Sequence, residues 1–561
     1  MSILIKNNNL ECTDYKNIKF DTIDNFIGDV IINNKVNKNI LTRFIGIIHF
    51  DSPHTKSSSK KNYIYKKCSI FFNYFQDIWI LTNKFKENKN MYAILKINWD
   101  KTNNLIFASV EEYIGYVSNF EIEQKVIYLL STCHWSKKID RILLGKDKKK
   151  IDLDFDIVKK RNIINDNIYS IDPNGCEDID DALQYNFIDN KHYVRIHIAD
   201  VTSFFENDSF IWDEMKNRVE SIYLNEKQIY MFPKEYTINY LSLKNDNKCK
   251  RSMTCVIIFD LNFNIEKYYF ERNLIKIINL SYDEANKMID ENKNNDLLML
   301  NKIAKTNYKK LVKNDNLYLD SHQLVEYFMI LANNKVAEYI SKHDENCLLR
   351  VQEKKDINNY KIKNKYSNKL NLLQMNRAEY KYKSDNNTHN GLNLDLYTHF
   401  TSPIRRYADC LVHQCINNIE LNNKKEISIE KVFNLNHYHS HYKKCLIYEN
   451  EINLVTEIIQ QKDKSFIDLE CVILFFNKNR CRVMTLDEKY IFDINILNEK
   501  IENSSNVEII NNSNEQVTII YNDKKIILSI LDKIITRICY IPHDLKKIKG
   551  YIQKPNLSFN L

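Results

Sequence analysis

Short apolar runs separated by polar loops dominate the first part of the chain and predict β-structure there. Four runs between residues 43 and 115 have this character: 43–48, 68–72, 78–81 and 92–97. Several short strands at close spacing favour a small β-barrel. The earlier segment 24–32 is also strand-like, but residues 1–32 are too few to form a complete barrel.

The centre of the chain has a different pattern, in which strand-like and helix-like segments alternate from about residue 167 to 460. Its clearest helix is predicted over 319–343, where Leu324, Phe328 and Val336 recur near helical spacing and indicate core packing. After about residue 466 the pattern again becomes β-rich. Four runs there predict a second barrel at the C-terminus: 467–475, 481–484, 516–521 and 525–530.

Composition adds limits to this outline. A chain of 561 residues exceeds a single hydrophobic core, so we expect several domains. The net charge of +8 permits a nucleic-acid partner without indicating one. Thirteen cysteines without a Cys-x-x-Cys pair are typical of a reducing compartment. Because no signal peptide or membrane-spanning apolar run is found, we expect a soluble intracellular protein that does not bind membranes.

One short segment is strongly acidic. Asp172, Asp178, Asp180 and Asp181 fall within ten residues, and no Lys or Arg lies among them. Carboxylates held this close repel one another unless a positive charge lies between them. Hard oxygen ligands without His or Cys at zinc spacing favour Mg²⁺ or Mn²⁺. The alternative is an acidic surface loop with a turn at 173–175, which the strand-like flanks argue against.

A second informative stretch contains two neighbouring arginines. Ser402 and Pro403 predict a helix start, with a hydroxyl cap followed by proline at the first helical position. This places Arg405 and Arg406 in the first turn, where a phosphate would be bound. The alternative is an arginine pair that forms only local salt bridges. His399 and His413 are interpreted as structural.

Together, an acidic metal site and an arginine-bearing phosphate site are the parts of a phosphodiesterase centre. Four segments carry a more specific resemblance: 170–183, 197–201, 324–333 and 397–413. They resemble the ribonuclease II / ribonuclease R (RNB) family of hydrolytic 3′→5′ exoribonucleases, and most closely the eukaryotic branch that includes the catalytic subunit of the exosome.

The resemblance implies an α+β multidomain protein, with a mixed α/β RNB catalytic domain flanked by small OB-type β-barrels at both ends. It implies five regions: a remnant of a first cold-shock barrel (1–32), a cold-shock-type OB barrel (33–120), a linker (121–166), the catalytic domain (167–460) and a C-terminal OB-type RNA-binding barrel (461–561). The shortened first barrel puts processivity in question, but not the chemistry.

The resemblance also implies roles for individual residues. The metal ligands would be Asp172, Asp178, Asp180 and Asp181, which would hold two Mg²⁺ ions for which Mn²⁺ can substitute. Asp180 and Asp181 would be catalytic together with Arg405, which would contact the scissile phosphate. RNA would be bound by Tyr223, Ser402, Arg405 and Arg406, with the Tyr223 ring stacked on the terminal base. Glu326 would lie near the site or on a helix surface.

We therefore expect a Mg²⁺-dependent 3′→5′ exoribonuclease that degrades single-stranded RNA to nucleoside 5′-monophosphates by a two-metal mechanism, as a monomer. Association with an exosome-like complex, and the choice between nucleus and cytoplasm, stay open. The alternative is a catalytically inactive RNA-binding protein. Retention of all four aspartates and of Arg405 favours activity. A DNA or cyclic-nucleotide phosphodiesterase fits the metal chemistry but not the flanking barrels.

Overall fold

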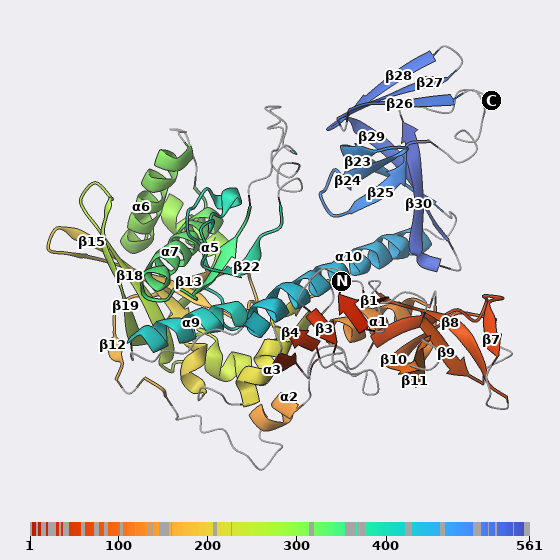
Figure 1. Cartoon of the computed structure of the whole chain (residues 1–561). Helices are drawn as coiled ribbons and strands as arrows, with labels where there is room; N and C mark the ends of the chain where they lie inside the picture. Colours follow the sequence, from red (N-terminus) through yellow and green to blue (C-terminus); the bar gives the residue numbers. More distant parts are fainter. Residues whose placement is uncertain are drawn as a thin grey trace. The chain divides into compact units, whose positions relative to one another are not determined.

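The structure is a computed structural model of the whole chain (Figure 1). It describes residues 44–554 apart from short gaps, the longest of which are 145–155, 354–365, 421–428 and 498–506, and five strands before residue 44. The chain divides into two compact units. The first comprises Met1–His134, Lys355–Met375 and His441–Leu561, and the second comprises Trp135–Lys354 and Asn376–Ser440. The division falls within the long helix α10 (Ile429–Gln460).

The first unit begins with a five-stranded antiparallel sheet in sequential order: β1 (Ile3–Lys6), β2 (Asn9–Cys12), β3 (Ile18–Phe20), β4 (Val30–Ile32) and β5 (Lys35–Asn37). Most of the predicted strand 24–32 lies outside the described residues, and β4 is its described part. The interpretation of residues 1–32 as the remnant of a first barrel stays a prediction.

A closed barrel follows, as the apolar runs predicted. Its strands are β6 (Phe44–Ile48), β8 (Ile64–Ile70), β9 (Ile78–Thr82), β10 (Met91–Asp100) and β11 (Leu105–Tyr116), with β7 (Thr55–Ser57) added to β8. The barrel closes because β6 pairs with both β10 and β8. Helix α1 (Phe120–Thr132) packs on it, and the Tyr92 hydroxyl donates to the buried Glu123 of that helix at 2.9 Å.

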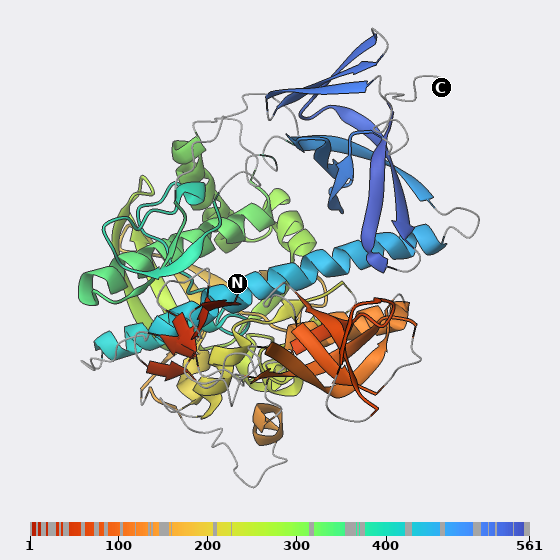
Figure 2. The ribbon, with the colours of Figure 1, turned by 45° about the vertical axis from the view of Figure 1, so that its right-hand side comes forward.

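The C-terminal part of this unit is a second closed barrel (Figure 2). Its strands are β23 (Phe466–Asn477), β24 (Arg480–Thr485), β25 (Ile491–Asn495), β29 (Lys533–Ile541) and β30 (Asp544–Lys554). The prediction of a barrel is confirmed, and all four predicted runs are strands, but two of them do not belong to the barrel. The runs 516–521 and 525–530 form β27 (Gln516–Tyr521) and β28 (Lys524–Ser529), which join β26 (Val507–Ser513) in a separate three-stranded sheet.

That sheet packs on the barrel instead of joining it. Val517, Ile519 and Leu528 are buried in the same core cluster as barrel residues such as Val472 and Ile538. Their apolar side chains therefore have the burial of barrel strands, although their backbone pairs elsewhere.

The second unit is built on a mixed seven-stranded sheet of order β12-β19-β18-β15-β14-β13-β20. The strands are β12 (Asn162–Ile164), β13 (Tyr169–Asp172), β14 (Asp181–Ile188), β15 (Lys191–Ala199), β18 (Lys250–Phe259), β19 (Ile265–Ile275) and β20 (Ile278–Ser281). Most pairs are antiparallel, whereas β12 pairs with β19 and β13 pairs with β20 in parallel. β18 is buried along nearly its whole length and forms the core of the sheet.

Helices α5 (Tyr282–Asp290), α6 (Asn295–Val312) and α7 (Ser321–His343) pack beside this sheet (Figure 1). The predicted helix 319–343 is confirmed as α7. It begins with a capping box, in which the Asp320 carboxylate accepts from the Gln323 backbone N–H and the Gln323 side chain accepts from Asp320 N–H. Helix α9 (Tyr407–Glu420) contacts α7 and carries a buried apolar face. No helix within the described residues is long and apolar enough to cross a membrane.

Candidate active site

The acidic segment joins two neighbouring strands of the central sheet. Asp172 ends β13 and Asp181 begins β14. The tip turns at Gly175, whose φ of 80° is a conformation that glycine adopts without strain, and Cys176 N–H donates to Pro173 O at 3.1 Å. Behind the tip, Leu243 N–H donates to Ile179 O at 2.9 Å. The strand flanks and the turn at 173–175 were both predicted.

The arginine segment, residues 401–406, precedes helix α9. The predicted helix start at Ser402 and Pro403 is wrong, because α9 begins at Tyr407. Arg406 N–H does donate to Ser402 O at 3.0 Å, as in a helical turn, but Tyr407 N–H donates to Val219 O at 2.7 Å. The two arginines therefore lie in a turn before the helix, and a helix N-terminus does not explain their placement.

Side chains hold this turn in place from several directions. The buried Asp409 carboxylate accepts through Oδ1 from Ser402 N–H at 2.7 Å and from Arg406 Nη2 at 2.8 Å. From α7, the buried Asn333 accepts from Phe400 N–H at 2.8 Å. Charge-assisted bonds to a buried carboxylate are among the strongest hydrogen bonds in proteins. Arg406 thus forms the local salt bridge that was the alternative interpretation, whereas Arg405 does not.

Arg405 joins the arginine segment to the acidic segment. Its Nε donates to Asp180 Oδ2 at 3.1 Å, and its Nη2 donates to Ser402 Oγ at 2.9 Å. The other Asp180 oxygen, Oδ1, accepts from Ile404 N–H at 2.8 Å, across 224 residues of sequence. Asp180 is 3% exposed, whereas the Arg405 side chain is 43% exposed and reaches solvent.

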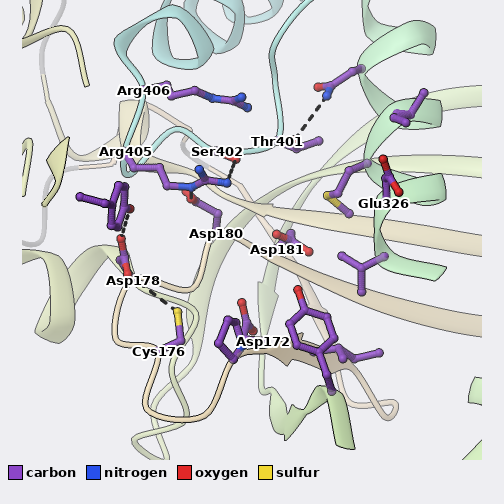
Figure 3. A pocket seen from close by; sticks show the side chains of 18 of the residues that line it. Asp172, Cys176, Asp178, Asp180, Asp181, Glu326, Thr401, Ser402, Arg405 and Arg406 are labelled. Atoms are coloured by element: carbon purple, nitrogen blue, oxygen red, sulfur yellow. Dashed lines mark hydrogen bonds and ion pairs between the residues drawn. The ribbon is translucent and has the colours of Figure 1, made fainter. Parts of the chain in front are cut away.

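The two segments line one cavity of about 670 Å³. Figure 3 shows the four aspartates and Arg405 around this space, with Glu326 of α7 on the opposite side from Arg405. Every predicted site residue lines it: Asp172, Asp178, Asp180, Asp181, Tyr223, Ser402, Arg405 and Arg406. Residues that were predicted from stretches far apart in sequence are therefore brought together.

Tyr223 lies at the edge of the cavity, in a short hairpin of β16 (Ile222–Tyr223) and β17 (Gln228–Ile229). Tyr223 is 46% exposed, so its ring is accessible, while its hydroxyl donates to Asp178 Oδ2 at 2.7 Å. Gln228 Nε2 donates to the same oxygen at 2.9 Å.

Burial and mutual repulsion disfavour the ionised form of three of the carboxyls. Burial, with the charge of Asp178, raises the pKa of Asp172 to about 6, against a hydrogen bond from Ser170. Burial raises the pKa of Asp180 to about 7, although Arg405 and Ile404 N–H oppose the shift. Burial and the charges of Asp172 and Asp180 raise the pKa of Asp181 well above its usual value. A cation between these groups would relieve both costs.

The oxygen donors of the cavity suit a divalent cation. Within the described part of the chain, no three His, Cys, Asp or Glu side chains are already arranged as a metal-binding cluster. The buried Asp172 Oδ2, however, has no hydrogen-bond partner among the described residues. An all-oxygen set of crowded carboxylates with such an uncompensated atom fits Mg²⁺ or Mn²⁺.

The histidines near the arginines are structural, as interpreted from the sequence. His399 Nδ1 pairs with the Tyr380 hydroxyl at 2.6 Å, and His413 Nε2 pairs with Phe400 O at 2.8 Å. The sequence reasoning missed three residues that organise the site: Gln228, Asn333 and Asp409. Asp409 lies four residues after Arg405, so an acidic residue closely following the arginine pair was an available signal.

The central part of the chain matches a known family. Residues 160–422 match the family described as "RNB domain", and they are therefore an RNB domain. The chain is 30% identical over 401 residues to the exosome complex exonuclease RRP44 of Homo sapiens. The aligned region covers 58% of this chain and 41% of the human protein. The chain is 25% identical over 375 residues to ribonuclease R of Chlamydia pneumoniae. That aligned region covers 55% of this chain and 54% of the relative.

This chain is thus homologous to RRP44 exonucleases and to ribonuclease R, and it matches about half or less of the length of these relatives. Solved structures extend the likeness in fold. The apo form of Mycoplasma genitalium ribonuclease R has a TM-score of 0.67 at 18% identity and covers 94% of this chain and 91% of its own. Yeast Ssd1, a pseudonuclease, has a TM-score of 0.64 at 18% identity and covers 83% of this chain and 66% of its own. The predicted fold class, a mixed α/β domain with flanking β-barrels, is confirmed.

Proposed function

We propose that this protein is a hydrolytic 3′→5′ exoribonuclease that degrades single-stranded RNA to nucleoside 5′-monophosphates. The observation that carries the proposal is the shared cavity, which four aspartates from one segment and Arg405 from another line together. Homology to RRP44 exonucleases and to ribonuclease R supports RNA degradation at the level of the family.

The residues divide the work according to their contacts. Asp172, Asp178, Asp180 and Asp181 would hold Mg²⁺, for which Mn²⁺ can substitute. Bound there, the ions would supply Lewis-acid stabilisation of phosphoryl charge and lower the pKa of water. Arg405 is fixed by Asp180 and Ser402 but remains accessible, so its guanidinium would bind the oxygens of the scissile phosphate.

RNA would be held by groups that do not read its sequence. The exposed ring of Tyr223 would stack on the terminal base, and stacking tolerates every base. Ser402 acts through Arg405, to which it is hydrogen-bonded, and Arg406 acts by holding the turn through Asp409.

The reaction is a hydrolysis of the last phosphodiester. The oxygen of water bonds to phosphorus, and the bond between phosphorus and the 3′ oxygen of the preceding nucleotide breaks. That oxygen takes up a proton and becomes the new 3′ hydroxyl of the shortened RNA. The released nucleotide keeps the phosphate on its 5′ oxygen, which gives a nucleoside 5′-monophosphate.

A second candidate is an RNA-binding protein that does not cleave, because a pseudonuclease shares the fold with a TM-score of 0.64. The site argues for cleavage. All four carboxylates and Arg405 are retained, and the pairing of Arg405 with Asp180 keeps the guanidinium at the cavity wall.

The test is to incubate 5′-labelled single-stranded RNA with the purified protein and Mg²⁺, and to identify the released nucleotide by mass spectrometry. We expect a ladder that shortens from the 3′ end, release of nucleoside 5′-monophosphates, and no reaction when EDTA removes the metal. A DNA strand of the same sequence is the matched control. Internal cuts, or RNA that is bound and stays intact, would contradict the proposal.

A further inference from the structure

The β16–β17 hairpin contributes more to the cavity than the ring of Tyr223. Tyr223 and Gln228 are directly opposite each other across the two strands, so their side chains lie on the same face of the hairpin. Both donate to a single atom, Asp178 Oδ2, at 2.7 Å from the Tyr223 hydroxyl and 2.9 Å from Gln228 Nε2. One cross-strand pair therefore donates two hydrogen bonds to a single carboxylate oxygen of the acidic segment.

The two oxygens of Asp178 have unequal partners. Oδ2 accepts the two hydrogen bonds from the hairpin, whereas the contact of Oδ1 is with the Cys176 thiol at 3.8 Å, and a thiol is a weak donor. Asp178 is 9% exposed, so neighbouring donors satisfy its oxygens more than water does. The two donors fix the carboxylate through one oxygen and leave the other without a strong protein partner among the described residues.

The same hairpin is attached to the arginine segment. Immediately before it, Ser221 N–H donates to Arg405 O at 2.9 Å, and Glu220 and Arg406 form a backbone bridge. At its other end, Met231 N–H donates to the Ser221 hydroxyl at 2.8 Å, which closes the base of the hairpin. The hairpin therefore connects Asp178 to the backbone of Arg405, although these two residues lie on separate segments.

We propose that Gln228 is a positioning residue that acts with the Tyr223 hydroxyl to orient Asp178 for a divalent cation. This inference rests on the proposed function and assigns a residue outside the acidic segment to it. It also separates two roles of Tyr223, because its hydroxyl donates to Asp178 and its ring would stack on the terminal base of the RNA. Hydrogen bonds to a ligating carboxylate are worth roughly 10- to 100-fold in metal affinity.

The test is Mn²⁺ binding to the full-length protein without RNA, followed by electron paramagnetic resonance. Gln228→Met keeps the length of the side chain but removes the donor, and we expect Mn²⁺ affinity to fall roughly 10- to 100-fold. Tyr223→Phe keeps the ring but removes the hydroxyl donor, and it should weaken Mn²⁺ binding in the same range. Asn239→Met, at an exposed amide in the helical segment that follows the hairpin and outside the cavity lining, is the matched control and should bind Mn²⁺ as the wild type does.

Cleavage assays give the second readout. In Gln228→Met the Mg²⁺ concentration for half-maximal rate should rise by the same factor, with KM for RNA unchanged. If Gln228→Met does not fold, Tyr223→Phe alone carries the test. Wild-type affinity for Mn²⁺ in both variants would overturn the positioning role and leave the proposed function standing. A wild-type protein that binds no Mn²⁺ but cleaves RNA would overturn both the positioning role and the metal requirement.

Discussion

The acidic segment and the arginine segment reach the same cavity by different means. The acidic segment is a local structure that connects the end of β13 at Asp172 to the start of β14 at Asp181. Its tip at 173–175 is exposed. The arginine segment has no regular structure of its own. Buried side chains from α7 and α9 and the backbone at Val219 hold it. The comparison teaches that the arginine half depends on tertiary contacts, so it should be the more fragile.

The largest effect is expected where the arginine segment is held. Asp409→Asn leaves Arg406, whose side chain is 20% exposed, without its fully buried charge partner, and removing one member of a buried ion pair costs about 3–5 kcal/mol. The free energy of unfolding, measured with urea, should fall by about this amount. Asp395→Asn, an exposed carboxyl in the preceding loop, is the control and should change it by less than about 0.5 kcal/mol. Equal stability of the two variants would mean that the arginine segment is not held by this pair.

Arg405→Lys should separate chemistry from stability within the same segment. Lysine cannot reproduce the planar contacts to Asp180 and Ser402. Loss of one preorganised donor to the reacting phosphate lowers kcat by about 10²- to 10³-fold. The urea midpoint should stay near that of the wild type, because the Arg405 side chain is 43% exposed. A fall in stability without a fall in kcat would assign Arg405 a structural role.

Metal binding should reveal the strain within the acidic segment. With the pKa of Asp172 at about 6 and of Asp180 at about 7, the metal-free fold holds more protons than the unfolded chain, whose carboxyls titrate near about 4. Metal-free stability therefore falls as pH rises from about 4 to about 7. Mg²⁺ favours the ionised carboxylates, so it should raise Tm more at about pH 8 than at about pH 5.

At a Mg²⁺ concentration of 100 times Kd, the free energy of unfolding would increase by about 2.7 kcal/mol. Differential scanning calorimetry with and without EDTA measures it, and Asp172→Asn should show a smaller gain at the higher pH. An equal increase in Tm at both pH values would contradict the account of crowded carboxyls.

The smallest effect is expected at the tip of the acidic segment. A Cβ added at Gly175 meets no atom within 4 Å, so Gly175→Ala suffers only the conformational cost of a φ of 80°. That cost is about 1–2 kcal/mol, and cleavage should change little at saturating Mg²⁺. A loss of stability as large as that of Asp409→Asn would remove the distinction between the two segments.

The same contrast explains what could be predicted from the sequence. The acidic segment was predicted with its flanking strands and turn, because apolar flanks, Pro173 and Gly175 act locally. The helix start at Ser402 was wrong for a tertiary reason. Ser402 and Pro403 favour a helix start locally, but the Asp409 carboxylate accepts from the Ser402 N–H and the backbone of Arg406 pairs with Glu220, so the helix begins only at Tyr407.

The C-terminal barrel shows the same limit. The strand runs 516–521 and 525–530 have the apolar character of barrel strands, since Val517 and Ile519 are buried in the barrel's core cluster. Which strands close the ring depends on backbone pairing between β25 and β30, far apart in sequence. Gln228 was missed because a glutamine in a short hairpin carries no sign of the carboxylate that it contacts 50 residues away.

The most direct test of the joined site is single-turnover cleavage of 5′-labelled RNA by Asp180→Asn beside the wild type, with RNA affinity measured on the same preparations. Asp180 contacts both Ile404 and Arg405, so its charge serves both halves of the cavity. We expect the rate to fall by about 10²- to 10³-fold while RNA affinity stays near the wild-type value. A wild-type protein that binds RNA but cleaves it no faster than Asp180→Asn would contradict the account and indicate a pseudonuclease.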